Sequence, residues 1–324
     1  MLSSGKPAFT SFTFSLSYPA NCHIQYHRIS MPLSKLSFGP FHLHTIETGH
    51  FRLDGGAMFG VVPKTLWARF IEVDDKNRIP MAMRCLLITS ENTGRTYLVD
   101  NGCGTKFDQK FEDIYQLDYS QHTLNNSLEE HGFTPNDVTD LIFSHLHFDH
   151  CGGTTFYNSQ GNLKHTFPNA TYHITKKHLE TATHPNARES ASFLPDNITP
   201  IANWKRLNTV EEHHRYEEGL DALAVNGHTL GQQLPKITVG DQTIVFMADL
   251  IPTHVHLPLP WVMGYDMYPV QTLHEKERIL DQAVEENWYL FLEHDATEEV
   301  ITIQKEQGKY RVKERLSLGE IPSV

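Results

Sequence analysis

The sequence lacks three features that would assign it to well-known classes of protein. No apolar run approaches the roughly 18 residues that a membrane-spanning helix needs. Its lysines and arginines form no cluster and the formal net charge is −12, which disfavours nucleic acid as a partner. The cysteines fit neither a disulfide framework nor a zinc knuckle, so a reducing compartment, the cytoplasm, is expected. They are Cys22, Cys85, Cys103 and Cys151.

Acidic residues are also absent from the first thirty positions, which are rich in Ser, Phe and Tyr and end just before Met31. Only Lys6 precedes the apolar stretch and no small-x-small cleavage site follows, so a secretory signal is weakly supported. A transit peptide, a disordered tail and an over-long gene start are the other interpretations. We expect residues 1–36 to be an N-terminal extension and residues 37–324 to form a single domain.

Short apolar runs separated by turns and helices follow from residue 38 onward. Runs at Arg84–Thr89 and Arg95–Val99 flank Glu91–Gly94, and a Gly-Asp pair separates Lys236–Val239 from Thr243–Met247, so two hairpins are predicted. Further strands are predicted at Leu141–Phe143, Ala170–Ile174, Leu220–Val225 and Tyr289–Leu292, with helices at Leu124–His131, from Lys176 and across Leu273–Trp288. Mixed strands and helices of this kind are typical of a layered α/β domain.

Histidine is abundant, with 21 residues, so a metal site has to be argued from spacing rather than from content. His145, His147, Asp149 and His150 follow the predicted strand Leu141–Phe143 directly. At an extended strand end residues two apart point the same way, so His145 and His147 can bind one ion together. The chain then turns, and Asp149 and His150 can face a second ion beside it. A His-rich solvated loop is the alternative, but chance gives this pattern in fewer than about one chain in a hundred.

Three further candidate ligands also follow predicted strands. They are His228, Asp249 and His294. Imidazole and carboxylate donors suit Zn²⁺, and Fe or Mn are also feasible. Other histidines lie in predicted loops, where a surface or rim position is expected. These are His213, His214, His254 and His256.

The ordered set of motifs resembles the ligand set of the metallo-β-lactamase superfamily over residues 40 to 300. The motifs are His145–His150, Gly227-His228-Thr229, Ala248-Asp249 and His294-Asp295. The resemblance implies a four-layer αββα sandwich of the α/β class, with the site at one edge between two sheets. It implies a first metal ion bound by His145, His147 and His228, a second bound by Asp149, His150 and His294, and Asp249 bridging both. A hydroxide shared by the two ions would be the nucleophile, with Asp149 exchanging the proton of the leaving group.

Two stretches, Leu53–Lys64 and Ala248–Pro260, resemble the lactonase and organophosphate-hydrolase branch, which includes quorum-quenching N-acyl-homoserine lactonases. This resemblance implies that the protein opens a lactone or cleaves a related ester. Pro252 is a departure, because those lactonases place a tyrosine there to hold the substrate carbonyl. Tyr265 or Tyr268 of the same loop is a substitute.

The alternatives are a phosphotriesterase-type hydrolase, a thioesterase of the glyoxalase II type and a metal-free binding module of the same fold. The glyoxalase II pattern differs from this chain, because Leu230-Gly231-Gln232 follows the Gly-His-Thr segment in place of Pro-Gly-His. The complete ligand set disfavours the metal-free module.

The substrate is expected to be a small molecule, held against apolar walls. The candidate substrate-binding residues are Met58, Phe59, Trp261 and Tyr265, with Trp67 as a further apolar wall. Ordinary core packing is the competing interpretation of each apolar residue. The proline-rich segment Leu257–Trp261 suits either a substrate lid or a homodimer contact.

Overall fold

The computed structural model describes residues 34–324, which belong to a compact unit running from Leu33 to Val324. The predicted N-terminal extension comprises residues 1–36, and its residues 1–33 lie outside the described part of the chain. Its last two residues already belong to the first strand, β1 (Lys35–Phe38). Within residues 34–324, no helix is both long enough and apolar enough to cross a bilayer.

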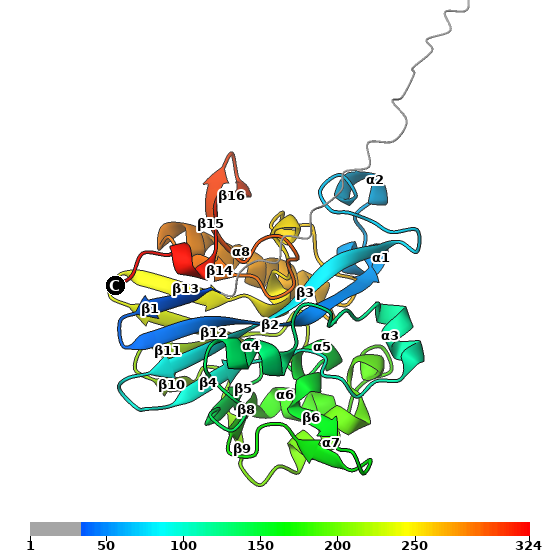
Figure 1. Ribbon diagram of the computed structural model, residues 1–324. Helices are drawn as coiled ribbons and strands as arrows, with labels where there is room; N and C mark the ends of the chain where they lie inside the picture. The colour runs from blue at the N-terminus through cyan, green and yellow to red at the C-terminus, as the bar shows by residue number, and fades with distance from the viewer. Residues whose placement is uncertain (1–33) are drawn as a thin grey trace, which may run out of the picture. The chain divides into compact units, whose positions relative to one another are not determined.

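Two seven-stranded sheets form most of the described region (Figure 1). The first contains, in spatial order, β1, β2 (Phe41–Asp54), β3 (Arg78–Ser90), β4 (Thr96–Val99), β5 (Asp140–Ile142), β8 (Thr171–Thr175) and β9 (Leu207–Val210). The second contains β10 (Arg215–Glu217), β11 (Leu220–Val225), β12 (Gln232–Val239), β13 (Gln242–Phe246), β14 (Tyr289–Phe291), β15 (Val300–Glu306) and β16 (Lys309–Leu316). A small separate hairpin pairs β6 (Thr155–Tyr157) with β7 (Leu163–His165).

The helices connect these strands. They are α1 (Gly55–Phe59), α2 (Lys64–Trp67), α3 (Gln109–Tyr115), α4 (Leu124–Glu130), α5 (Phe148–Cys151), α6 (Lys176–Thr183), α7 (Pro195–Ala202) and α8 (Pro269–Glu285). Short 3-10 turns are η1 (Gly152–Thr154), η2 (Ser190–Ser192), η3 (Ala248–Leu250), η4 (His254–His256) and η5 (Leu318–Glu320). Local sequence sets their starts: Thr123 and Thr175 cap α4 and α6 by accepting backbone N–H groups, and Pro269 opens α8.

The side chains of β3 show how the layers form. Leu86 and Ile88 belong to a core shared with the second sheet, whereas Cys85 and Leu87 belong to a core shared with α4, α6 and α7. Adjacent residues of a strand point to opposite faces, so one strand contributes to both cores. Helix α8 packs on the second sheet through Ile279. The predicted four-layer αββα sandwich is therefore confirmed.

Most of the predicted elements are confirmed at nearly the predicted positions. The strand predicted at Leu220–Val225 is β11 without change, and the helix predicted at Leu124–His131 is α4. Both predicted hairpins are present, as β3 with β4 and β12 with β13. Buried alternation and turn residues were sufficient signals for these local structures.

The strands that precede the candidate ligands run in common directions. In the second sheet β13 is parallel to β14, and β11 and β13 both run antiparallel to β12, so all three point the same way. In the first sheet β4, β5 and β8 are parallel. The carboxyl ends of parallel strands meet at one sheet edge. The segments after β5, β11, β13 and β14, which carry His145, His228, Asp249 and His294, are thereby brought to the ends of their sheets.

Candidate metal centre

Four of the predicted ligands converge in a first group. The Nε2 atom of His145 lies 3.0 Å from Nδ1 of His147, and that Nδ1 lies 3.2 Å from Nε2 of His228. Oδ2 of Asp249 lies 3.1 Å from Nε2 of His228 and 3.7 Å from Nε2 of His145. All four side chains are buried. A cation bound between them satisfies three ring nitrogens that cannot all donate to one another.

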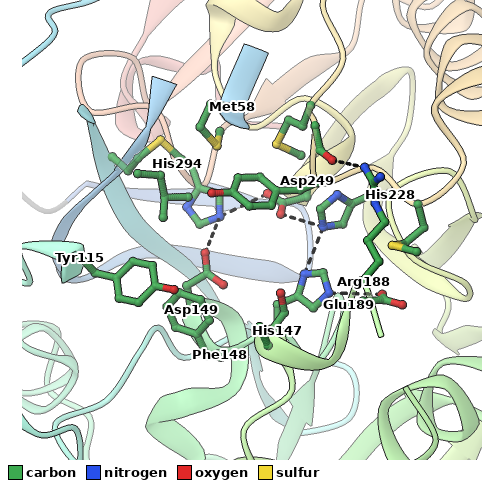
Figure 2. A pocket seen from close by; sticks show the side chains of 18 residues that line it. Met58, Tyr115, His147, Phe148, Asp149, Arg188, Glu189, His228, Asp249 and His294 are labelled. Carbon is green, nitrogen blue, oxygen red and sulfur yellow. Dashed lines mark hydrogen bonds and ion pairs between the residues drawn. The ribbon is translucent and has the colours of Figure 1, made fainter. Parts of the chain in front are cut away.

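The other three predicted ligands form a second group beside the first, of which Figure 2 shows Asp149 and His294. Nε2 of His294 lies 3.1 Å from Nε2 of His150, and oxygens of Asp149 lie 3.8 Å from each of these nitrogens. Asp249 reaches this group as well, with Oδ2 at 3.6 Å from His150 and Oδ1 at 3.3 Å from His294. Oδ1 of Asp249 is buried and accepts no hydrogen bond from the described residues. An acceptor in that condition fits a second cation.

The electrostatics of the two groups favour positive charge. Burial lowers the pKa of His145 well below its ordinary value, so this ring is neutral and able to donate a lone pair. Burial alone would raise the pKa of Asp249, but His228, His150 and His294 hold it well below its usual range. Burial alone would lower the pKa of His294, but Asp249 and Glu293 together raise it to about 9. Bound cations would replace such protons, so metal binding is expected to release protons.

Carboxylates outside the predicted set hold the far sides of the ligand rings. Oδ1 of Asp266 lies 3.0 Å from Nδ1 of His228. Oε1 of Glu189 lies 3.4 Å from Nε2 of His147 and also accepts a hydrogen bond from the hydroxyl of Thr229. Such partners fix the tautomer and orientation of a metal-binding imidazole.

Two acidic side chains lie beside His150, and Asp100 is the one that forms a hydrogen bond with it. Its Nδ1 lies 3.1 Å from Oδ2 of Asp100 and 3.1 Å from Oε2 of Glu293. Asp100 follows β4 and also accepts hydrogen bonds from the backbone and hydroxyl of Ser144. Asp100 directly follows a predicted strand, as the ligands do, and that position was the signal that could have identified it.

A further histidine, His178 on α6, supports the segment between the first two ligands. Its Nε2 accepts a hydrogen bond of 2.8 Å from the backbone N–H of Leu146, and its Nδ1 donates to the carbonyl of Leu230 at 2.9 Å. Burial lowers the pKa of His178 to about 3, so the ring stays neutral and keeps this acceptor at physiological pH. The helix therefore fixes the backbone that presents His145 and His147.

Gly152 and Gly153 directly follow the motif His145–His150. Their position suggests that the turn needs the conformational freedom of glycine, but the structure shows a different reason for them. Gly152 has helical angles, φ −63° and ψ −31°. A Cβ at Gly152 would overlap the carbonyl of Cys103, and one at Gly153 would overlap the carbonyl of Asn101. Both glycines are needed because two backbone segments pass very close to each other.

A cavity of about 360 Å³ opens over the two groups (Figure 2). Its floor includes five of the predicted ligands, His147, Asp149, His228, Asp249 and His294. The remaining lining residues form the wall and rim, mostly apolar, and several are methionines. They are Leu53, Met58, Met81, Tyr115, Phe148, Arg188, Glu189, Ala191, Ser192, Met263, Gly264, Tyr265 and Met267.

The four predicted substrate-binding residues divide into two pairs. Met58 and Tyr265 line the cavity, whereas Phe59 and Trp261 are not among its lining residues. Phe59 is fully buried and stacks on Trp67, with ring centroids 4.8 Å apart. It also stacks on His256, at 4.6 Å. Phe59 and Trp67 thus support the wall from behind.

The expectation of a surface or rim position is wrong for His256. Its side chain is 1% exposed, its Nε2 donates to the carbonyl of Met58 at 2.9 Å, and its Nδ1 accepts from the hydroxyl of Thr253 at 2.8 Å. The buried Lys276 of α8 donates to the carbonyls of Pro258 and Trp261, which anchors the segment Leu257–Trp261 to that helix.

Comparison with known proteins agrees with this geometry. The family model of the metallo-beta-lactamase superfamily matches residues 84–294, which carry all seven predicted ligands. The chain belongs to the metallo-beta-lactamase superfamily. Members of this superfamily generally bind divalent metal ions, and the two His/Asp groups supply suitable donors.

Relatives within the superfamily include N-acyl homoserine lactonases. One from Bacillus sp is 31% identical over 108 residues, 33% of this chain and 36% of the relative. One from Bacillus thuringiensis is 27% identical over 177 residues, 54% of this chain and 62% of the relative. The alignments therefore span less than two thirds of these curated relatives.

Among solved structures, a probable metal-dependent hydrolase from Staphylococcus aureus is 26% identical. The match covers 87% of this chain and 100% of that chain, with a TM-score of 0.76. AidC, described as a dizinc quorum-quenching lactonase, shares the fold at 20% identity and a TM-score of 0.69, with 88% and 98% of the two chains covered.

Proposed function

We propose that residues 37–324 form one catalytic domain, a metal-dependent hydrolase that binds two divalent ions, with zinc as the leading candidate. His145, His147 and His228 would hold the first ion, and Asp149, His150 and His294 the second. Asp249 would bridge them. The observation that carries the proposal is the position of Asp249, whose carboxylate lies 3.1 Å from His228 of one group and 3.3 Å from His294 of the other.

Divalent ions at these positions would lower the pKa of a water molecule toward neutrality and polarise the substrate carbonyl. The residues of the chain then account for the rest of the reaction. Asp249 holds the two groups at a fixed separation. Asp149 lines the cavity and can accept the proton of the water that adds to the substrate carbonyl carbon, then pass it to the alkoxide as the carbon–oxygen bond to the leaving group breaks. Met58 and the other methionines of the wall exclude bulk water.

The substrate is proposed to be a lactone or a related ester. Two findings support it: relatives named N-acyl homoserine lactonases, and a largely apolar cavity wall suited to an acyl chain. The resembling lactonases have a tyrosine at the position of Pro252. Tyr265 is the candidate to replace it here, because Tyr265 lines the cavity. Burial raises the pKa of the Tyr265 phenol, so its hydroxyl stays protonated and can donate to a carbonyl oxygen.

The test is a panel of homoserine lactones, carboxylic esters, thioesters and aryl phosphotriesters, assayed with zinc-supplemented protein and with Asp249→Ala as the inactive control. Turnover of lactones or esters that disappears in the variant is the expected result. Turnover of phosphotriesters alone would replace the proposed substrate class. Protein that binds less than about one equivalent of zinc would contradict the hydrolase itself and indicate a binding module.

A further inference from the structure

The residues that line the cavity include a single cationic side chain that is not part of the ligand set. It is Arg188, the only lysine or arginine among the described residues that line the cavity. In Figure 2 its side chain runs beside His228, on the opposite side of the view from Tyr115. The next residue, Glu189, is the carboxylate that contacts His147. This short segment thus presents a carboxylate to a ligand and a cation to the substrate space.

The guanidinium of Arg188 is held in place by backbone groups. Its Nη2 donates to the carbonyl of Gly264 and, at 3.5 Å, to that of Asp266. Both carbonyls belong to the segment that carries Tyr265 and Met263 of the cavity wall. A side chain fixed in this way has already lost much of the conformational freedom that ligand binding would otherwise cost.

Arg188 is exposed, and its charge is not neutralised by the described part of the chain. No ion pair joins it to a carboxylate of residues 34–324, and its side-chain hydrogen bonds there come from Nη2, which leaves Nε and Nη1 free for a ligand. This is notable in a chain with a net charge of −12. The carboxylates that line the cavity all contact other groups. Asp149 and Asp249 belong to the proposed ligand set, and Glu189 contacts His147 and Thr229.

We propose that Arg188 binds a negatively charged group of the substrate, such as a carboxylate, at the end remote from the bond that is cleaved. The preferred substrate is then an ester or lactone whose acyl part carries an anionic terminus. Guanidinium donors form strong charge-assisted hydrogen bonds with carboxylates, and an apolar surrounding strengthens them. This inference rests on the proposed hydrolase for its reaction, but anion binding at Arg188 can be measured without turnover.

The kinetic test compares two esters of equal length, 4-nitrophenyl hexanoate and the mono-4-nitrophenyl ester of adipic acid. They differ only in the terminal methyl, which is a carboxylate in the adipate. In Arg188→Met, kcat/KM for the charged ester should fall about tenfold relative to the neutral one, the effect of losing one charge-assisted hydrogen bond. Arg188→Lys should restore part of this ratio, because it keeps the charge.

The matched control is Arg206→Met. Arg206 is also exposed and donates to a backbone carbonyl, that of Asn169, but it is not among the lining residues. Its removal should leave the ratio unchanged. If Arg188→Met slows both esters equally, or slows neither, Arg188 only ties two loops together and the inference is wrong.

A binding measurement separates this inference from the proposed reaction. Adipamate and hexanamide carry an amide in place of the ester and differ by the same terminal carboxylate. Calorimetric titration of the zinc-supplemented protein should show adipamate binding weakened about tenfold in Arg188→Met, with hexanamide unaffected. Arg188-dependent binding of adipamate by a protein that hydrolyses neither ester would support the anion site and contradict the proposed ester substrate. Adipamate affinity that is the same in both proteins would overturn the anion site.

Discussion

The two groups of proposed metal ligands and the cavity wall are built in different ways. The ligands follow the ends of strands in two sheets, are buried, and have ring nitrogens or carboxylate oxygens held by further residues such as Asp266 and Asp100. The wall comes mainly from loops and short helices, with Leu53 of β2 and Met81 of β3 added, and four of its residues are methionines. The ligands are fixed in one arrangement by their position at strand ends and by hydrogen bonds, whereas the thioether side chains of methionine can adapt their shape. The reaction chemistry is therefore rigidly specified, and substrate choice is left to a more variable surface.

The largest effect is expected for Asp249→Asn, which removes the charge shared by the two groups. Hydrolysis should fall at least about a thousandfold, because both cations lose a common ligand. Steady-state kinetics with simultaneous metal analysis measures this, and the bound metal should fall below the wild-type content. Near-normal activity in this variant would show that the ligand groups are no more strictly specified than the wall.

The next effect concerns the carboxylates behind the ligands. Glu189→Gln and Asp266→Asn should each weaken zinc affinity about 10- to 100-fold, because the imidazoles of His147 and His228 lose a charged partner. Competition with a chromophoric chelator measures the affinity. Glu212→Gln is the control, since Glu212 bonds to Asn226 and Lys177 and contacts no ligand. An equal loss of zinc affinity in Glu212→Gln would show that the carboxylates behind the ligands have no special effect on metal binding.

These carboxylates also mark the limit of what the sequence predicts. All seven ligand positions came from a compact motif and from residues that follow strands, and the structure brings them into two adjacent groups. Glu189 and Asp266 lie in irregular segments with no periodicity, so nothing in the local pattern connects them to distant histidines. His178 was equally hidden, because a helical histidine is more often a packing residue. Contacts made only by the tertiary fold leave no local signal.

The wall shows the same limit more strongly. Apolar character alone selected Met58, Phe59 and Trp261 together, but only Met58 reaches the cavity, since the two aromatic rings pack behind it. His256 was assigned to the rim because it lies in a loop, yet it is buried against the carbonyl of Met58. Which face of a loop points inward depends on the chain packed against it.

A smaller effect is expected from the wall itself. Met263→Ala should enlarge the cavity and change kcat/KM for long-chain esters by about three- to tenfold, the range for a lost apolar contact. Activity toward the shortest ester should change less, because a short chain does not reach the widened region. Val270→Ala, an exposed site outside the cavity, is the control. A loss of bound zinc in Met263→Ala would show that wall and ligands are not independent.

The smallest effect on activity is expected for His256, which supports the wall, so its role is tested through stability. Burial lowers the pKa of His256 from 6.5 to about 3. Its unfolded state therefore takes up a proton below pH 6.5 that its folded state refuses, so stability falls as the pH drops from 6.5 toward 3. His256→Gln, which keeps a donor and an acceptor, should reduce the loss of unfolding free energy between pH 7 and pH 5 by about 2 kcal/mol. Urea denaturation at both pH values measures this, and parallel pH dependences would contradict a neutral buried ring.

Hydrolysis is proposed to depend on two cations, held by the seven ligands and bridged by Asp249. Metal-free protein should be titrated with zinc while bound metal and ester or lactone hydrolysis are recorded together. Activity is expected to be absent without metal, to rise with added zinc and to stop rising at about two equivalents per chain. Full activity in metal-free protein, or saturation of activity at a single equivalent, would contradict it.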